Sequence, residues 1–410
     1  MTTRSCLRLA TLLAALLSAA ASLNVGFYNT TCPSAEAIVN QTVAAAFGNT
    51  SEVAPALIRM HFHDCFVRVS TCTNGTIVFK QMSCYALMLG SSCGCLASLY
   101  LKKKKKEKEE ESCIDFSLSA YALGCDGSVL IDSTPNSTAE KDAIPNNPSL
   151  HFFNVIDSAK SALEAQCPGV VSCADILAFA ARDSVVLTGG IGYQVPSGRR
   201  DGLVSLANNT VDLPPPFFNA TQLVQNFANK NLTLEDMVVL SGAHTLGVSH
   251  CSSFAQSPLA DRLYNFSGTG GADPSLSAAY AFLLKSICPS NSSQFFPNTT
   301  TSMDIISPTK FDNKYYVGVQ NSLGLFKSDA ALMTNATMAA LVDSFVRNEM
   351  TWKKKFAKAM VKMGNIQVLT GTQGEIRLNC RVVNPTSSAA GVQQVVAGSG
   401  SSGSTGVAGS

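Results

Sequence analysis

Helix signals dominate the sequence after residue 150, while the alternation of apolar and polar positions that is typical of strands is scarce. The pattern therefore predicts an all-α fold with short β hairpins at most. Capping residues begin two of the predicted helices, at Ser172 and Thr233. One follows Ser172, one leads from Thr233 toward His244, and two cover Asn335–Arg347 and Thr351–Met363. Pro, Gly and Asn predict loops at 208–216 and 268–274.

Both ends of the chain differ in composition from the rest. An apolar run, Leu9–Leu17, follows two arginines and precedes small residues, which is the arrangement of a secretory signal peptide. We expect residues 1–22 to be removed and residues 23–385 to form one domain, since neither a linker nor a repeat divides them. Residues 386–410 are rich in Gly and Ser, so we expect this tail to be disordered or removed.

The net charge and the cysteine content limit the classes of binding partner and the cell compartments that fit this sequence. A net charge of +2 argues against a nucleic-acid partner, which normally needs a concentrated basic face. About a dozen Asn-X-Ser/Thr sequons agree with passage through the secretory pathway. Of the 14 cysteines, Cys6 leaves with the signal peptide and five lie between residues 69 and 123. The even number that remains predicts four disulfides, in a pairing that the spacing does not determine.

Two short stretches that lie far apart carry the candidate chemistry. Arg59 and His63 are four residues apart and project from one face of a helix, which places a permanent cation beside an imidazole. Such a pair suits the cleavage of a peroxide. Residues 240–245 carry His244, a histidine of the iron-ligand type, so the two stretches together indicate the two faces of a haem. His61 faces away from His63 on the same helix and is interpreted as structural.

Six motifs occur in a fixed order along the chain. They are Arg-Met-His-Phe-His-Asp-Cys-Phe-Val at 59–67, Val-Ser-Cys-Ala-Asp-Ile-Leu at 171–177, Gly-Arg-Arg-Asp at 198–201, Val-Val-Leu-Ser-Gly-Ala-His-Thr-Leu-Gly at 238–247, Phe-Asp-Asn-Lys-Tyr-Tyr at 311–316 and Met-Val-Lys-Met-Gly-Asn-Ile at 360–366. With these motifs the chain resembles the secreted plant haem peroxidases (class III) over nearly all of residues 23–385. The resemblance implies a two-lobed fold that holds the haem between distal and proximal helices.

The resemblance also implies a reaction, the hydrogen-peroxide-dependent one-electron oxidation of phenolic donors through a ferryl haem intermediate, with haem b as cofactor. His244 would be the axial ligand of the haem iron and give its other N–H to Asp329, which makes the imidazole more anionic. On the distal side, His63 would move the proton of the peroxide and Arg59 would stabilise the developing charge. Phe62 belongs to the same catalytic set.

Three further roles follow from the resemblance. Asn146 would accept the second N–H of His63 and so fix its tautomer, and Glu140 would orient Asn146. Pro214 would lie beside the phenolic donor. We therefore expect a monomeric enzyme, secreted to the cell wall or delivered to the vacuole, that acts on hydrogen peroxide and small phenols without a nucleic-acid or membrane partner.

Two calcium sites and four disulfides complete the implied set. Calcium takes hard oxygen ligands. The distal calcium would bind Asp64, Val67, Gly124, Asp126 and Ser128. The proximal calcium would bind Thr245, Asp304, Ser307, Lys310 and Asp312. The implied disulfides are Cys32–Cys167, Cys65–Cys125, Cys173–Cys380 and Cys251–Cys288.

One segment departs from the family pattern. Residues 69–123 are inserted between Arg68 and Gly124, at a point where the family has no additional residues. The insertion contains an uncharged, cysteine-bearing run followed by lysines. We interpret them as translated intervening sequence or a mis-joined gene model, with a functional insertion as the alternative. Because the insertion falls inside the distal calcium loop, the alternative function is a catalytically impaired, haem-peroxidase-like secreted glycoprotein. A misfolded product without function is the third hypothesis.

Part of this insertion also has the length of a membrane span. Gln81–Leu101 is about as long as a bilayer is thick and is followed by lysines, although its glycines and serines argue against a span. A span there would place His63 and His244 on opposite sides of a membrane.

Smaller departures from the family pattern are Tyr193, where the family usually has tryptophan, and the pair 151–152, where it usually has arginine-glycine. Neither is among the implied haem ligands.

Overall fold

The structure, a computed structural model, describes four stretches of the chain and the backbone of two short strands. The stretches are residues 22–67, 124–255, 261–290 and 299–385, and the strands lie within residues 72–77. The predicted signal peptide (apart from Ser22), nearly all of the insertion and the predicted tail therefore lie outside the described residues. Within these stretches no helix is long and apolar enough to cross a membrane.

Nearly all of the regular secondary structure in the described chain is helical, which confirms the predicted fold class. The α-helices are α2 (Ala35–Asn49), α3 (Val53–Phe66), α4 (Phe153–Gln166), α5 (Cys173–Leu187), α6 (Ala220–Ala228), α7 (Leu234–Ser241), α8 (Ala278–Ile287), α9 (Lys314–Gln320), α10 (Lys327–Ala331), α11 (Ala336–Arg347) and α12 (Glu349–Met363). Short 3₁₀ helices are η1 (Ser128–Leu130), η2 (Glu140–Asp142), η3 (Ala207–Asp212), η4 (Gly242–Thr245), η5 (Cys251–Ser253) and η6 (Phe266–Gly268). The strands are β1 (Cys72–Thr73), β2 (Thr76–Ile77), β3 (Val248–His250) and β4 (Thr300–Ser302).

Side-chain caps begin the predicted helices where the sequence indicates them. Ser172 accepts a hydrogen bond from the backbone N–H of Asp175 at the start of α5, and Thr233 forms a reciprocal capping box with Asp236 at the start of α7. Helix α12 begins two residues earlier than predicted, because its cap is Asn348. The loop predicted at 208–216 is also partly wrong, since η3 occupies its first half.

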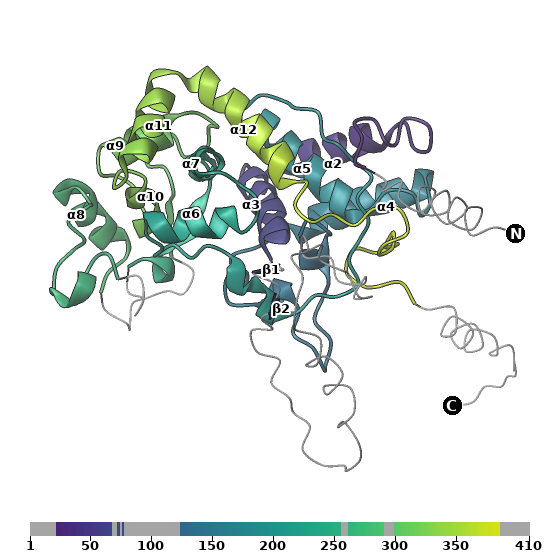
Figure 1. The fold of residues 1–410 in the computed structure, drawn as a ribbon, viewed down its shortest axis with the longest axis horizontal. Helices are drawn as coiled ribbons and strands as arrows, with labels where there is room; N and C mark the ends of the chain where they lie inside the picture. The colour runs from purple at the N-terminus through teal and green to yellow at the C-terminus, as the bar shows by residue number, and fades with distance from the viewer. Residues whose placement is uncertain are drawn as a thin grey trace, which may run out of the picture.

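The two larger hydrophobic cores divide most of the helices into two lobes with α3 between them (Figure 1), and a smaller third core contains residues of α8. One core is formed mainly by α2, α4 and α5 and receives Leu57 and Met60 from α3. The other is formed mainly by α6, α7, α9, α11 and α12 and receives Ile58 and Phe66. Helix α3 is therefore a wall shared by both lobes. The same helix carries the predicted distal residues.

Helix α12 packs against the helix that leads to His244. Trp352, the only tryptophan of the chain, stacks on Phe311 with ring centroids 4.7 Å apart. Its indole N–H donates to the carbonyl of Val239 in α7 over 3.1 Å. Glycine is required at position 242, because a Cβ there would lie 2.7 Å from the Trp352 ring. Close packing thus fixes the backbone just before His244.

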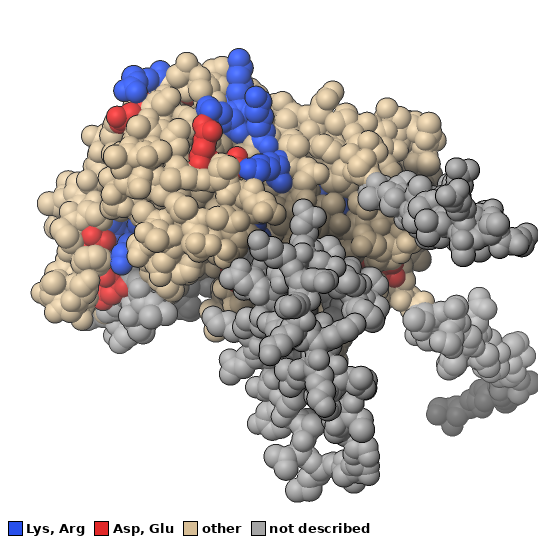
Figure 2. Space-filling model, viewed as in Figure 1, with Lys and Arg blue, Asp and Glu red and all other residues tan. Residues whose placement is uncertain are grey.

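Ion pairs on the surface tie the same two helices together. Lys355 and Lys362 of α12 bind Glu235 and Asp236 of α7, with N–O distances of 2.6 and 2.5 Å. Figure 2 shows basic side chains gathered along the upper part of this face, where Figure 1 places α12. Exposed pairs of this kind add little stability each, so the buried packing is the main support of α7.

A two-stranded sheet follows His244 and brings a distant segment to it. Strand β3 pairs antiparallel with β4, with Val248 opposite Ser302. These strands are far apart in sequence, so they form no hairpin, whereas β1 and β2 form a short hairpin of the kind predicted. The backbone N–H of Met303 also donates to the carbonyl of Gly247 over 3.0 Å. As a result, the segment that begins at Asp304 lies beside Thr245.

Disulfides join segments from across the described chain. The structure contains the four pairs that the resemblance implies, Cys32–Cys167, Cys65–Cys125, Cys173–Cys380 and Cys251–Cys288. The first and third anchor the lobe of α2, α4 and α5, the fourth anchors α8, and the second ties the end of α3 to the segment after the insertion.

Candidate active site

The distal histidine is held by a chain of hydrogen bonds. Nδ1 of His63 lies 2.6 Å from Oδ1 of Asn146. The side-chain N–H of Asn146 donates to the backbone carbonyl of Glu140 over 2.7 Å, which leaves Oδ1 as the atom that faces His63. Because that oxygen can only accept, Nδ1 of His63 carries the proton and Nε2 carries the lone pair. The arrangement therefore prepares Nε2 to act as a base.

Glu140 orients Asn146 through its backbone rather than its carboxylate. The carboxylate instead accepts hydrogen bonds from Oγ of Ser128 over 2.8 Å and from Nδ2 of Asn209 over 3.1 Å. Asn209 is a residue that the sequence did not single out, because it lies in a segment predicted as a plain loop. The carboxylate thus links the distal histidine network to η3 and to the predicted distal calcium segment.

Arg59 lies on the same face of α3 as His63 and is held by the residue next to Asn146. Its Nη2 donates to the carbonyl of Pro145 over 3.0 Å. Burial lowers the pKa of Arg59 to about 10, so it remains a cation at neutral pH. Burial, and secondly the charge of Arg59, lower the pKa of His63 well below its ordinary value. His63 is therefore neutral at the pH at which it would have to accept a proton.

Two neighbours of His63 on α3 differ in their surroundings. Phe62 is half-buried and packs edge-on against His63, with ring centroids 5.7 Å apart. It also packs against Phe66 in a tilted arrangement, with ring centroids 4.2 Å apart. His61 is buried, and burial together with the charge of Arg199 lowers its pKa to about 3. Its Nδ1 lies 3.8 Å from Sγ of Cys65. This packing agrees with the structural role expected for His61.

The second histidine is paired with a carboxylate. Nδ1 of His244, in η4, lies 2.7 Å from Oδ1 of Asp329 in α10. Burial alone would raise the pKa of Asp329, but His244 and the hydrogen bonds to the carboxylate outweigh it and lower the pKa. Asp329 is thus an ionised acceptor, and the proton on Nδ1 leaves Nε2 of His244 free to bind a metal. The side chain of His244 is 37 % exposed while that of Asp329 is 2 % exposed, as an open metal ligand on a buried support would be.

The predicted proximal calcium ligands lie together. Oγ1 of Thr245 donates to the carbonyl of Lys310 over 3.2 Å and lies 3.4 Å from a carboxylate oxygen of Asp304. Oγ of Ser307 lies 2.8 Å from Oδ1 of Asp312 and 3.2 Å from Asp304. Burial raises the pKa of Asp304, with Asp312 adding to the effect. This oxygen cluster, with two carboxylates close together, fits a divalent cation.

The predicted distal calcium ligands are gathered only in part. Asp64 accepts the backbone N–H of Gly127 over 2.9 Å, and Asp126 accepts that of Ser128 over 3.1 Å. Burial, and then the charge of Asp126, raise the pKa of Asp64 well above its ordinary value. Burial also raises the pKa of Asp126 to about 7. Such buried carboxylates fit a cation between them.

The carbonyl of Val67 has another partner at this site. It accepts a hydrogen bond from Nζ of Lys230 over 2.9 Å. The carbonyl of Gly124 accepts the backbone N–H of Asp126, also over 2.9 Å. Among the described residues no three His, Cys, Asp or Glu side chains form a metal-binding cluster. Both predicted calcium sites instead pair two carboxylates with hydroxyl and carbonyl oxygens.

Pro214, the predicted donor contact, follows η3 and is half-buried. The same loop is joined to the proximal side, since the backbone N–H of Ser328 donates to the carbonyl of Pro216 over 3.0 Å. Tyr193, which stands where the family usually has tryptophan, packs against both hydrophobic cores. The contact between Ser328 and Pro216 places the loop beside α10, which carries Asp329.

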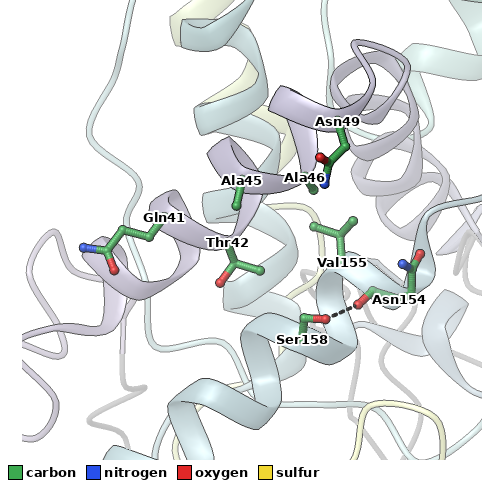
Figure 3. Close-up of a pocket in the computed structure, with 8 residues that line it drawn as sticks. All are labelled: Gln41, Thr42, Ala45, Ala46, Asn49, Asn154, Val155 and Ser158. Atoms are coloured by element: carbon green, nitrogen blue, oxygen red, sulfur yellow. Dashed lines mark hydrogen bonds between the residues drawn. The ribbon is translucent and has the colours of Figure 1, made fainter.

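A separate surface cavity of about 470 Å³ lies between α2 and α4 (Figure 3). It is lined by Gln41, Thr42, Ala45, Ala46, Asn49, Asn154, Val155 and Ser158. Inside it, Oγ of Ser158 donates to the backbone carbonyl of Asn154 over 2.9 Å. None of the predicted site residues lines this cavity, so it is distinct from the candidate active site.

Comparisons with known proteins agree with this geometry. A sequence profile of the peroxidase family matches residues 39–348, which is more than half of the chain. The chain is 49 % identical to Peroxidase 1 of Zea mays over 373 residues, covering 90 % of this chain and 85 % of that protein. It is 50 % identical to Peroxidase 5 of Vitis vinifera over 365 residues, covering 89 % and 92 %. The chain therefore belongs to the plant peroxidase family and is a class III haem peroxidase.

Proposed function

We propose that His63 and Arg59 carry the peroxide chemistry of this enzyme and that His244 holds the haem iron. The observation that carries the proposal is the contrast between the two histidines. His63 is buried, neutral and bonded to an amide oxygen, whereas His244 is open on one side and bonded to an ionised carboxylate. The first environment suits a base and the second suits an electron-rich metal ligand.

The distal residues would act on the two oxygens of the peroxide. Nε2 of His63 would take the proton of hydrogen peroxide, and the imidazolium would return it to the departing oxygen, which leaves as water. The guanidinium of Arg59 would stabilise the negative charge on that oxygen. Asn146 would keep the Nδ1 proton of His63 in place during both transfers. The haem, when bound, supplies the iron that exchanges electrons between donor and peroxide.

Family membership implies haem and calcium as cofactors, and hydrogen peroxide and a reducing donor as substrates. Beyond that, we propose haem b, one calcium ion at each predicted site, and small phenols as donors beside Pro214. We also propose a monomer that is secreted to the cell wall or delivered to the vacuole, with residues 23–385 as its domain. These proposals rest on the resemblance of the motifs, and the oxygen clusters at the two calcium sites support them.

The impaired alternative gains no support from the described residues. His63 is bonded to Asn146, Arg59 is held by the carbonyl of Pro145, and the disulfide between Cys65 and Cys125 closes the end of α3. The distal helix, which ends just before the insertion, therefore keeps the contacts that hold it in place.

Guaiacol oxidation by the full-length, haem-loaded chain tests the proposal. We expect activity with hydrogen peroxide, and we expect His63→Leu to slow the reaction with peroxide by about 10²–10⁴ without loss of haem. His61→Gln, on the same helix, is the matched control and should keep most of the rate. An H63L variant that reacts as fast as the unchanged enzyme would remove His63 from the mechanism.

A further inference from the structure

The carboxylate of Asp329 serves more than the proximal histidine. Its Oδ2 accepts the backbone N–H of Phe326 over 2.7 Å. Its Oδ1 accepts both the Nδ1 proton of His244 over 2.7 Å and the phenol O–H of Tyr315 over 2.9 Å. His244 and Tyr315 therefore share a single acceptor atom.

Tyr315 is fixed in this position. It belongs to α9, is 3 % exposed, and packs in the core of the lobe that contains α7. Its ring meets the His244 ring edge-on, with centroids 5.8 Å apart, and the Phe326 ring does the same at 5.7 Å. The phenol O–H of Tyr315 is the donor in its bond with Oδ1 of Asp329, over 2.9 Å.

A carboxylate oxygen that already accepts one hydrogen bond attracts a second proton less strongly, because the first donor withdraws its negative charge. The phenol of Tyr315 thus weakens the pull of Asp329 on the Nδ1 proton of His244. A weaker pull leaves the imidazole less anionic and a poorer electron donor to the iron.

We propose that Tyr315 is a positioning residue that, by sharing Oδ1 of Asp329 with His244, sets the electron donation of His244 and so the reduction potential of the haem. This inference rests on the proposed binding of iron by His244. It gives a role to Tyr315 in the 311–316 motif, in which Asp312 is a predicted proximal calcium ligand.

Tyr315→Phe removes the phenol hydroxyl and keeps the ring that packs against His244. We expect the iron–histidine stretch of the ferrous protein, measured by resonance Raman spectroscopy, to shift to higher frequency. We also expect the reduction potential of the haem, measured by spectroelectrochemistry, to become more negative. Both shifts follow from stronger donation by His244 once Asp329 is free of the second donor.

Tyr316→Phe is the matched control. Tyr316 is the next residue and is equally buried, but its hydroxyl donates to the carbonyls of Val238 and Val239 over 2.8 and 3.1 Å. Loss of that hydroxyl should leave the stretch and the potential unchanged. In an Asp329→Asn background, Tyr315→Phe should likewise have no effect, because the shared carboxylate is gone.

The outcomes separate this inference from the proposed function. If the unchanged ferrous protein shows no iron–histidine stretch, the binding of iron by His244 is wrong and the inference falls with it. If the stretch is present but Y315F leaves it and the potential unmoved, the role of Tyr315 is wrong and the proposed function stands. Should Y315F fail to fold, a fluorotyrosine at position 315 is a stronger donor of similar shape. It should shift both readouts in the opposite direction, and unmoved readouts would again overturn the inference.

Discussion

The ammonium of Lys230 donates a hydrogen bond to the carbonyl oxygen of Val67, 2.9 Å away, just before the insertion begins. Lys230 is 3 % exposed, so the C-terminal end of α3 is held by a cation that is shielded from water. A positive charge at the end of a helix stabilises its last carbonyls. This contact fixes the end of the distal helix from a segment that lies outside the insertion.

Lys230→Met should therefore destabilise the enzyme. Methionine keeps an unbranched apolar side chain but removes the donor to a buried carbonyl, at a cost of about 1–3 kcal/mol in the free energy of unfolding. Guanidinium denaturation, followed by circular dichroism, measures the change. Lys354→Met, at an exposed position of α12, is the control and should have little effect. Equal stability of K230M and the unchanged protein would show that the contact contributes nothing.

The effect of Arg59 on His63 predicts a change in the pH dependence of the reaction with peroxide. Burial is the main cause of the lowered pKa of His63, and the charge of Arg59 is the second. Arg59→Leu removes that charge, so the pKa of His63 rises toward its ordinary value of 6.5. Because the base must be unprotonated, the acidic limb of the pH–rate profile should move to higher pH.

Arg59→Lys is the matched control for this experiment. It keeps a cation near His63, so the acidic limb should stay close to that of the unchanged enzyme even though the rate itself falls. Stopped-flow mixing with peroxide at a series of pH values measures both variants. A limb that stays in place, or moves to lower pH, in R59L would contradict the electrostatic link.

Local contacts of the fold could be predicted from the sequence, whereas distant ones could not. The capping residues Ser172 and Thr233 act on N–H groups three residues away, so their pattern is visible in the sequence itself. Asn209 reaches Glu140 across 69 residues, and Lys230 reaches Val67 across 163. Nothing in the composition of either segment indicates these partners, because tertiary packing alone brings them together.

The site shows the same division. The spacing of Arg59 and His63 predicts a shared helix face from helix geometry alone, but the family resemblance was needed to connect His63 to Asn146 and His244 to Asp329. Neither source indicated that Tyr315 shares the carboxylate with His244, or that Glu140 acts through its backbone. Such details depend on which atom of a residue points inward, which a motif does not specify.

Removal of calcium should destabilise the enzyme through its buried carboxylates. Burial raises the pKa of Asp126 to about 7, from an ordinary value of 3.8. A group whose pKa is raised by folding opposes folding when it is charged, so the calcium-free protein should lose stability as the pH rises through about 7. Thermal unfolding with calcium and with EDTA, at pH 5 and pH 8, should show a larger difference at pH 8.

Asp126→Asn separates the two calcium sites. It removes one buried charge, so the calcium-free variant should be more stable than the calcium-free parent at pH 8, and the response to calcium should shrink. The remaining response should vanish when Asp312→Asn is added at the proximal site. If D126N keeps the whole response to calcium, the distal site does not bind the ion in this chain.

The contacts at both ends of residues 69–123 predict how the enzyme responds to their removal. Cys65 and Cys125 are joined with their Cα atoms 4.1 Å apart, and the backbone N–H of Cys125 donates to the carbonyl of Ile366 over 3.1 Å. These ends are held by residues outside the insertion, as Val67 is. A chain that lacks 69–123 should therefore keep its haem and oxidise guaiacol at a similar rate to the full chain. The free energy of unfolding should also rise by about 2 kcal/mol, because closing a shorter loop costs less entropy.

Guaiacol assays at equal haem content measure the activity of the two chains, and denaturant unfolding measures their stability. Activity in the shortened chain alone would mean that the insertion blocks the distal pocket and that the full chain is the impaired form.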